Sequence, residues 1–170
     1  MIVLMAGLPG TGKSSLARAL AAQCRGVVLD KDEIRRVLFP PDYVEYSASQ
    51  DDFCHSLMLQ TAAYLLSRHP DLTIFLDGRT FSRAYQLQNA IAFATRIPTP
   101  WRVIECVCSE ETARTRLEAS QGSHPAQNRT FALYKKLQAE FETIPDPKLV
   151  VDTDKSLTEC VSPAFPYLAG

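Results

Sequence analysis

The sequence predicts an α/β fold: one sheet of five parallel strands, flanked by helices and forming a single domain. Short apolar segments of strand length alternate with segments of helical periodicity along all 170 residues. Acidic residues or a glycine-rich loop follow four of the five strands. Parallel sheets bind their ligands at the edge formed by the carboxyl ends of the strands, where these residues would lie. With 46% apolar and 22% charged residues, the composition is that of an ordinary globular domain.

The strands are expected where apolar residues run together between turn residues or prolines. In chain order, these runs are 2–6, 27–29, 72–76, 101–107 and 149–151. Because most of them are apolar throughout, they suit strands that are buried on both faces of a parallel sheet with right-handed crossovers.

The helices are expected where apolar residues recur at helical spacing. These segments are 15–24, 33–38, 49–68, 82–96, 109–119 and 129–142. Prolines end several of them, and Pro40 and Pro70 follow the second and the third. A last helix is expected over 156–160, limited by Pro163 and Pro166.

The segment 7–14 fits the phosphate-binding loop G-x-x-x-x-G-K-[ST] and lies between a strand and a helix, as that loop requires. Glycines let backbone N–H groups approach a polyphosphate, and the following helix N-terminus attracts the same anion. Lys13 is expected to reach the β- and γ-phosphates and to act in catalysis, and Ser14 to ligate Mg²⁺. The residues expected to bind the nucleotide here are Gly7, Pro9, Gly10, Thr11, Gly12, Lys13, Ser14 and Ser15.

The second strand leads into a helix start that carries two more carboxylates. Phosphoryl transfer to a hydroxyl needs a proton acceptor, for which Asp30 and Asp32 are candidates. Asp32 and Arg35 are three residues apart and share a helix face, which predicts a catalytic base beside a cation that holds an anionic group of the substrate. The alternative is that Asp30 or Asp32 only caps the helix. Lys31 and Arg36 are expected to be solvated.

The third strand ends in Asp77, which Gly78, Arg79 and Thr80 follow. Asp77 is expected to act on Mg²⁺ through water and to line the substrate site. Arg79 is expected to bind the acceptor or the transferred phosphate. A simple turn built on Asp and Gly is the alternative for this segment.

Three arginines flank the polar segment 121–128. A loop that carries arginines can close over a nucleotide and stabilise developing charge. Arg116, on the turn before the segment, is expected to bind the nucleotide and to act in catalysis. Arg129 is the alternative, whereas Arg114 is expected on a solvated helix face and His124 is expected to be exposed.

The segments 7–14, 30–35, 77–80, 111–117 and 151–154 occur in the order found in small P-loop kinases. The chain resembles the group that contains polynucleotide 5′-hydroxyl kinases, chloramphenicol phosphotransferase and zeta-toxin-like kinases, often described as AAA-family ATPases. The resemblance implies a P-loop NTPase fold with strand order 2-3-1-4-5 and a short helical lid over about 116–130. It also implies that Asp32 and Arg35 form the Asp-x-x-Arg motif of the 5′-hydroxyl kinases, with Asp32 as general base and Arg35 as a phosphate-binding group.

The resemblance has two consequences for the nucleotide site. The lid of the family carries two arginines four residues apart, but Ser120 stands where the partner of Arg116 is expected. Arg129 is the residue that could replace it. Adenine is expected near the lid and the segment after the fifth strand, at about Thr153.

Charge and cysteine content narrow the class of protein. A net charge of −1 gives no general case for binding nucleic acid or an anionic membrane. No apolar run approaches the roughly 18 residues of a membrane span, and the five cysteines lack zinc spacing. We therefore expect a cytoplasmic protein with no membrane association. Nothing in the sequence indicates an oligomeric state.

These observations predict a kinase domain over 1–170 that takes Mg²⁺ and a nucleoside triphosphate, ATP or GTP. Its acceptor is expected to be a hydroxyl of a small molecule, nucleoside or nucleotide, onto which Tyr43, Tyr46 or Phe81 could stack. A 5′-hydroxyl polynucleotide kinase is one alternative, which the net charge does not favour. An ATP-hydrolysing regulatory or toxin-like module is the other.

Overall fold

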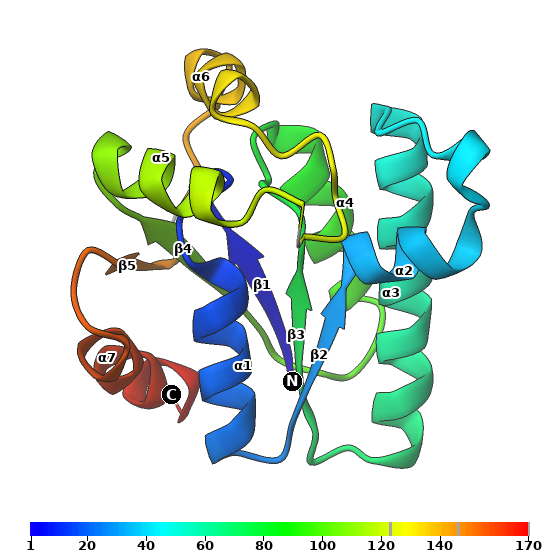
Figure 1. The fold of residues 1–170 in the computed structure, drawn as a ribbon. Coiled ribbons are helices and arrows are strands. Elements are labelled where there is room, and N and C mark those ends of the chain that lie inside the picture. Colours follow the sequence, from blue (N-terminus) through cyan, green and yellow to red (C-terminus); the bar gives the residue numbers. More distant parts are fainter. Residues whose placement is uncertain (123, 146, 170) are drawn as a thin grey trace.

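A five-stranded parallel sheet forms the centre of the molecule in the computed structural model, which describes residues 1–122, 124–145 and 147–169. Ser123, within the expected lid, and also Asp146 and Gly170 lie outside the described residues. The strand order is β2-β3-β1-β4-β5, which confirms the predicted order and the α/β class (Figure 1). The strands are β1 (Ile2–Ala6), β2 (Gly26–Asp30), β3 (Thr73–Asp77), β4 (Trp101–Val107) and β5 (Leu149–Asp152).

The register of the sheet brings its polar strand ends together. Asp30 at the end of β2 pairs with Asp77 at the end of β3. On the other side, Val107 pairs with Asp152 at the ends of β4 and β5. Because the strands are parallel, these ends and the loop after β1 lie at one edge of the sheet.

The helices connect the strands and lie close to the predicted segments. They are α1 (Lys13–Gln23), α2 (Lys31–Leu38), α3 (Ala48–Arg68), α4 (Ala84–Ala94), α5 (Glu110–Ala119), α6 (Phe131–Ala139) and α7 (Leu157–Ala169), with a short 3₁₀ turn at Pro41–Tyr43. None of the helices in the described part of the chain combines the length and apolar character needed to span a membrane.

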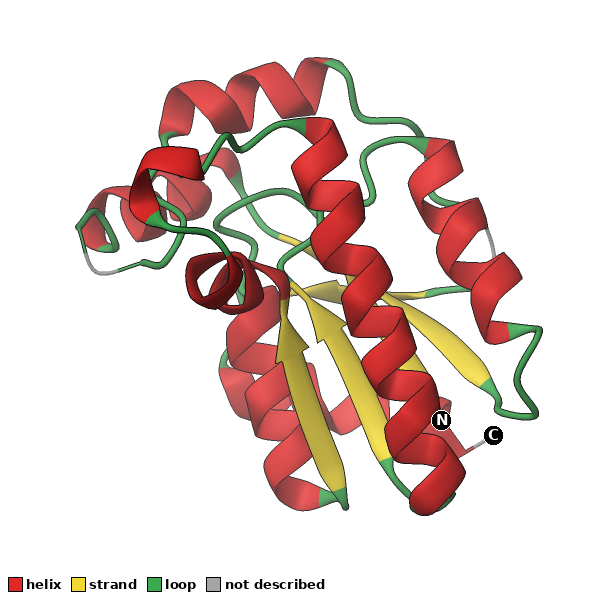
Figure 2. Ribbon diagram, turned by 90° about the vertical axis from the view of Figure 1, so that its right-hand side faces the viewer, coloured by secondary structure: helices red, strands yellow, loops and turns green. Residues whose placement is uncertain are grey.

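Helices cover both faces of the sheet in three layers (Figure 2). Alternate residues of β1 divide between the two cores, with Ile2 and Leu4 on one face and Val3 and Met5 on the other. The first core is completed by α3 and α4, and the second by α1 and α7. This arrangement leaves the carboxyl edge of the sheet to α2, α5 and α6.

The last helix differs from the prediction, because α7 continues through both prolines to Ala169. Cys160, Val161 and Ala164 are buried in the core that α1 shares with the sheet. Burial of this face outweighs the backbone hydrogen bonds that Pro163 and Pro166 cannot make.

The lid helix α6 begins two residues later than predicted, because Thr130 caps it by accepting a hydrogen bond from the Leu133 N–H at 3.2 Å. Tyr134 of α6 packs in a small separate core with Ala113 and Leu117 of α5. Arg129 therefore lies on the connection before α6 rather than on the helix itself.

The loop after β1 passes so close to β4 that one position requires glycine. Gly7 has φ = 125°, and a Cβ built there would lie 2.3 Å from the carbonyl oxygen of Cys106. The Cys106 oxygen belongs to the backbone of β4 and cannot move aside as a flexible side chain could. A larger residue at position 7 would therefore push the loop away from the sheet.

We expect Gly7→Ala to lower the free energy of unfolding by about 3 kcal/mol, since it adds a backbone clash to an unfavourable φ. Gly122→Ala is the matched control, because Gly122 has φ = 78° but an added Cβ would meet nothing within 4 Å. That control should cost only about 1 kcal/mol. Urea denaturation measures both, and equal losses in the two variants would contradict the close-approach argument.

Candidate active site

The loop between β1 and α1 brings the uncapped N-terminus of α1 to the edge of the sheet. Gly12 takes the left-handed conformation (φ = 76°) as the N-cap of α1 and contributes no side-chain cap. The first N–H groups of α1 consequently have no capping side chain, and the helix dipole adds positive potential there. This geometry suits an anion such as a phosphate.

Lys13 is buried in the first turn of α1, where only 8% of the residue is exposed. Its ammonium group donates hydrogen bonds of 2.7 Å to the carbonyl oxygens of both Gly7 and Leu8. Burial lowers the pKa of Lys13 to about 8, and the neighbouring Asp77 carboxylate opposes this shift.

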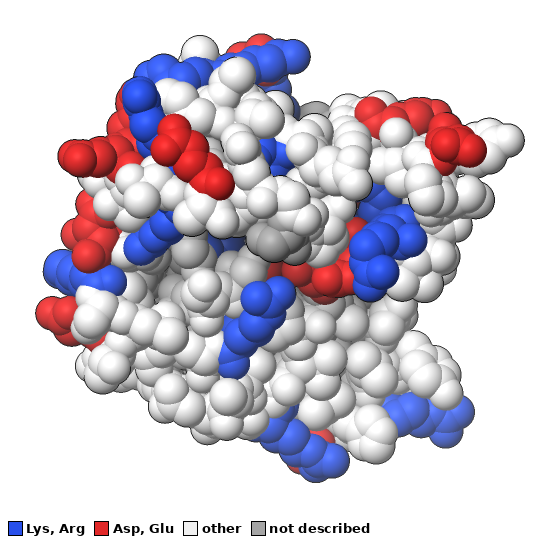
Figure 3. All heavy atoms as spheres, viewed as in Figure 1, with Lys and Arg blue, Asp and Glu red and all other residues white. Residues whose placement is uncertain are grey.

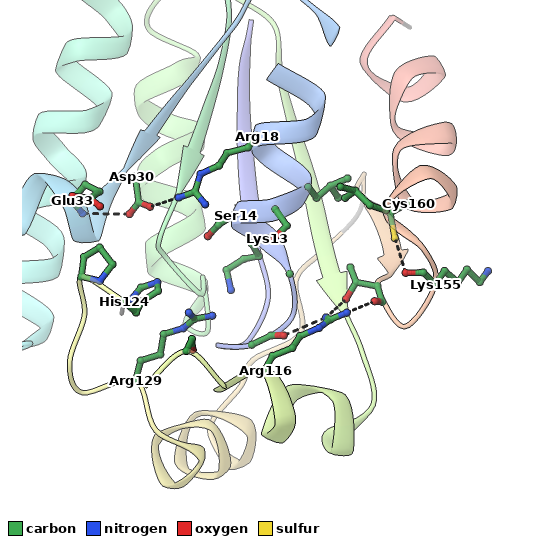
Figure 4. A pocket seen from close by; sticks show the side chains of 18 residues that line it. Lys13, Ser14, Arg18, Asp30, Glu33, Arg116, His124, Arg129, Lys155 and Cys160 are labelled. Atoms are coloured by element: carbon green, nitrogen blue, oxygen red, sulfur yellow. Dashed lines mark hydrogen bonds and ion pairs between the residues drawn. The ribbon is translucent and has the colours of Figure 1, made fainter. Parts of the chain in front are cut away.

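Two cavities meet at this lysine. The first, of about 660 Å³, extends from the loop toward Arg116, Thr153 and the start of α7. The second, of about 470 Å³, extends toward α2, α3 and α4. The residues that line both cavities are Lys13, Ser14, His124 and Arg129. Figure 4 shows the first cavity with these side chains around it.

Asp32 faces the second cavity within a cluster of charged side chains. It accepts a hydrogen bond from Arg35 at 2.7 Å and lies 3.5 Å from the Lys31 ammonium. The expectation that Lys31 is solvated is wrong: it is 6% exposed, and burial lowers its pKa to about 8. Arg36 is largely exposed, as predicted, and pairs with Glu33 at 2.8 Å.

Asp30 takes the capping role that the sequence left open between two carboxylates. It accepts hydrogen bonds from the Asp32 N–H at 2.9 Å and from the Glu33 N–H at 3.5 Å. Burial raises the pKa of Asp30, and the nearby Asp77 carboxylate acts in the same direction. Asp30 has its oxygen on the helix N-terminus and lines the first cavity, so of these two carboxylates Asp32 is the one that lines the second cavity.

Asp77 is fully buried at the end of β3 and lines the second cavity. Neither of its carboxylate oxygens has a hydrogen-bond partner among the described residues. A buried carboxylate of this kind requires a cation or ordered water. The Ser14 hydroxyl lines the same cavity, so the two side chains suit Mg²⁺ and its water ligands. Within the described ranges, no group of three or more His, Cys, Asp or Glu residues could hold a metal ion.

Arg79 lies away from both cavities, which differs from its predicted role in binding the acceptor. Its guanidinium donates to the backbone oxygen of Asp51 at 3.2 Å and pairs with the Asp52 carboxylate on α3. Phe81 is likewise in the core, where its ring packs edge-on against His55. Burial lowers the pKa of His55 to about 3, so this histidine is neutral.

Arg116 and Thr153 are in direct contact. The Arg116 guanidinium donates to the Thr153 carbonyl oxygen at 2.7 Å and to its hydroxyl at 3.0 Å, and reaches Gly10 O at 3.4 Å. The buried Thr153 hydroxyl also lies 3.0 Å from the Thr11 carbonyl oxygen. The phosphate loop is therefore tied to the segment after β5, on the side where the resemblance implies adenine.

Arg129 points toward Lys13 where the two cavities meet (Figure 4). Arg116 instead donates its hydrogen bonds to Thr153. Burial lowers the pKa of Arg129, and Asp32 and Asp77 oppose this shift. Arg129 therefore occupies the position at which an arginine could contact a phosphate between the cavities.

His124 lines both cavities and is half-buried, which differs from the expectation of an exposed side chain. Burial lowers its pKa, and Arg129 adds to the shift, so the ring is neutral near pH 7. Its Nδ1 accepts from the Ala126 N–H at 3.0 Å, which assigns the remaining proton to Nε2.

Tyr46 closes the second cavity between the α2–α3 connection and the lid. Its hydroxyl accepts from the Gln127 N–H at 3.0 Å, and its ring lies 5.2 Å from the Arg35 guanidinium. These contacts hold Tyr46 at φ = 51°, an uncommon conformation for a tyrosine. Of the three aromatic residues named from the sequence, Tyr46 alone lines this cavity among the described residues, and Tyr43 is 68% exposed.

Sequence reasoning missed Asp51 as well as Lys31. Asp51 lies in the first turn of α3, lines the second cavity and pairs with both Lys31 and Arg35. An acidic residue in a first helical turn is ordinarily explained by the helix dipole, so the local pattern carried no signal. Only the packing of α3 beside α2 reveals its position.

Comparison with known proteins identifies the family of this chain. The sequence profile of the family described as AAA domain matches residues 2–144. No curated protein was found to match the chain.

Solved structures share the fold at low identity. A gluconokinase from Sinorhizobium meliloti 1021 is 18% identical with a TM-score of 0.71, over 99% of this chain and 90% of that one. The APS kinase CysC of Mycobacterium tuberculosis, in complex with AMPPNP and APS, is 17% identical with a TM-score of 0.71, over 99% and 97%. Kti12 of Chaetomium thermophilum, in complex with ADP-AlF3, is 18% identical with a TM-score of 0.70, over 100% of both chains. The chain belongs to the AAA-domain family and has the fold of the small P-loop kinases.

Proposed function

We propose that this protein is a Mg²⁺-dependent kinase that transfers the γ-phosphate of a nucleoside triphosphate, ATP or GTP, to an acceptor hydroxyl. The observation that carries the proposal is the junction of two cavities at Lys13 and Ser14, with Asp32 on the acceptor side. A single ligand site would need one cavity, whereas transfer between two substrates needs two that share a reaction centre.

In this proposal the nucleotide occupies the first cavity. Its phosphates lie over the N-terminus of α1, and Lys13 exchanges its hydrogen bonds to Gly7 and Leu8 for the β- and γ-phosphates. Ser14 and Asp77 are the residues that would hold Mg²⁺, which when bound neutralises charge on these phosphates. Thr153 lines the same cavity and donates a hydrogen bond from its hydroxyl to the Thr11 carbonyl oxygen of the loop.

The acceptor occupies the second cavity, and Asp32 is the proposed general base. As the acceptor oxygen forms its bond to the γ-phosphorus, its proton passes to the Asp32 carboxylate. The bond between the γ-phosphorus and the bridging oxygen breaks, and that electron pair leaves with the nucleoside diphosphate. Arg35 and Lys31 hold Asp32 in place through their ion pairs.

The two lid arginines take different parts in the proposal. Arg129 faces the junction and stabilises the charge on the transferring phosphoryl group, the role that the sequence assigned first to Arg116. Arg116 holds Gly10 and Thr153 together and faces the nucleotide from the first cavity.

The direct test is a transfer screen with γ-labelled ATP or GTP and Mg²⁺. The acceptors are nucleosides, nucleotides, 5′-hydroxyl oligonucleotides and hydroxylated antibiotics. Labelled product with any member supports a kinase, and product with oligonucleotides alone supports the polynucleotide kinase alternative. Basic and acidic side chains are interleaved on the face in Figure 3, which does not favour a nucleic-acid channel. Sustained hydrolysis without transfer to any acceptor would instead support a regulatory ATPase.

The low pKa of Lys13 predicts that nucleotide binding weakens as pH rises through about 8. Only the protonated ammonium attracts phosphate, and by pH 9 about a tenth of the free protein retains it. We expect the Kd for Mg·ATP to be about tenfold higher at pH 9 than at pH 7, measured by calorimetry. Lys13→Ala should bind weakly at both values, and an unchanged pH profile in this variant would assign the titration to another group.

Removal of the proposed base should slow transfer and spare nucleotide binding. We expect Asp32→Asn to reduce kcat by about 10²- to 10⁴-fold, because the amide cannot accept the acceptor proton, with ATP affinity within about twofold of wild type. Asp42→Asn is the control, since Asp42 is exposed and lines neither cavity. Full turnover by Asp32→Asn with intact ATP binding would refute the assignment.

The role of Arg129 can be tested against that of Arg114, an arginine on α5 beside the lid. Arg129→Ala should reduce kcat by about 10²- to 10³-fold, with a small effect on ADP affinity, because ADP lacks the phosphoryl group that Arg129 is proposed to stabilise. Arg114→Ala is the matched control, since Arg114 lies 4.2 Å from the Phe131 ring and outside both cavity linings. Equal losses in the two variants would argue for a structural effect on the lid.

A further inference from the structure

The charged side chains of the second cavity carry information about the acceptor. Asp51 accepts from the Lys31 ammonium at 2.9 Å and pairs through the same oxygen with Arg35. Asp32 accepts from the other Arg35 nitrogen at 2.7 Å and lies 3.5 Å from Lys31. Two cations and two carboxylates therefore form one cluster, in which each cation contacts both carboxylates. The cluster has no net charge.

This cluster differs from the predicted anion site at Arg35. Lys31 and Arg35 are buried, with side-chain exposures of 8% and 3%, whereas the Asp51 side chain is 31% exposed. An incoming group would therefore meet the Asp51 carboxylate before it reached either cation. An anionic group would have to displace Asp51 from two ion pairs to gain the same two partners.

The opposite wall of the second cavity holds a further ion pair. Arg83 pairs with Glu140 of α6 at 2.6 Å. Lys136, on the exposed side of α6, also lines this wall, and the proposed function assigns the neighbouring Arg129 to the transferring phosphoryl group. Tyr85 and Tyr46 add aromatic rings and hydroxyl groups to the lining. Away from Lys13, Arg129 and Asp77, which the proposed function assigns to the phosphates and Mg²⁺, an acceptor meets hydroxyl groups, side-chain amides, charges that are mostly paired, and the exposed Lys136.

We infer that the second cavity selects an uncharged acceptor, such as a polyol, a sugar or a nucleoside, and that Asp51 is the residue that sets this preference. The inference rests on the proposed kinase function. Hydroxyl groups can donate to the free lone pairs of Asp51 and Asp32 without disturbing the ion pairs, and a ring can pack against a tyrosine. A cationic acceptor would find both carboxylates already neutralised.

The first arm of the test compares matched acceptors with wild-type protein. The members of each pair share the hydroxyl to be phosphorylated, and the anionic member carries a phosphate or carboxylate in place of another hydroxyl or hydroxymethyl group, as in a nucleoside and its 3′-phosphate or a sugar alcohol and the corresponding sugar acid. We expect kcat/KM to be at least about tenfold higher for the uncharged member of each pair. A preference for the anionic members would overturn the inference.

The second arm uses Asp51→Asn, with the adjacent Asp52→Asn as control. Asp52 has the same chemistry but pairs with Arg79 and lies outside the second cavity. Loss of the Asp51 charge leaves Lys31 and Arg35 with one carboxylate between them, so the preference for uncharged acceptors should fall by about tenfold or reverse. The control should keep the wild-type ratio, and an unchanged ratio in Asp51→Asn would remove Asp51 from the specificity determinant.

The third arm does not depend on turnover. With Mg²⁺ and a saturating non-hydrolysable ATP analogue in place, sulfate is titrated by calorimetry as a probe for a free anion site. Sulfate should bind Asp51→Asn at least about tenfold more tightly than it binds wild type or Asp52→Asn. Tight sulfate binding by the wild type would overturn the inference, and this measurement and the first arm decide it even if Asp51→Asn does not fold.

The arms separate failure of the inference from failure of the proposed function. If no acceptor is phosphorylated but sulfate distinguishes Asp51→Asn as expected, the kinase proposal fails and the charge balance of the cavity stands. If acceptors are phosphorylated with a preference for anions, the kinase proposal stands and the inference fails.

Discussion

The structure depends on an ammonium group buried at the edge of a hydrophobic sheet. An unpaired buried charge would cost several kcal/mol, so Lys13 must find acceptors where it lies. The carbonyl groups of Gly7 and Leu8 supply them, which requires the loop to turn back over the lysine. That turn brings Gly7 against Cys106 at the end of β4. The conformation of the loop, the packing of β1 against β4 and the charge of Lys13 therefore form one constraint.

The carboxylates around this lysine differ in what neutralises them. Asp30 is satisfied by the N-terminus of α2, and Asp32 by two cations. Asp77 is buried with no hydrogen-bond partner among the described residues, which marks it as the group that an incoming cation would complete. In the proposed function, these three neighbouring carboxylates serve as cap, base and metal-associated group because their surroundings differ.

The features that could be predicted well from the sequence are those that depend on local sequence patterns. The loop at 7–14, the strand order implied by the family resemblance and the pairing of Asp32 with Arg35 all involve residues close in sequence or a recognised motif. The contacts that were missed join distant segments, as when Asp51 reaches Lys31 and Arg35 across 20 and 16 residues. Arg79 was misplaced for the same reason, because its partners belong to α3. The extension of α7 through two prolines reflects burial against α1, which helix propensity alone does not include.

The division of the site between sheet and helices bears on how such a protein can change over evolutionary time. The phosphate side is built from the loop after β1 and the segment after β5, which are anchored in the core. The second cavity is lined by residues from α2, from the first turn of α3 and from the lid, which lie outside the sheet. In the proposed function, substitutions in these helix termini and in the lid would alter which molecule is accepted while the phosphate chemistry stays intact. One scaffold can therefore diversify its substrates through a few helix-terminal positions, with the loop and sheet held constant.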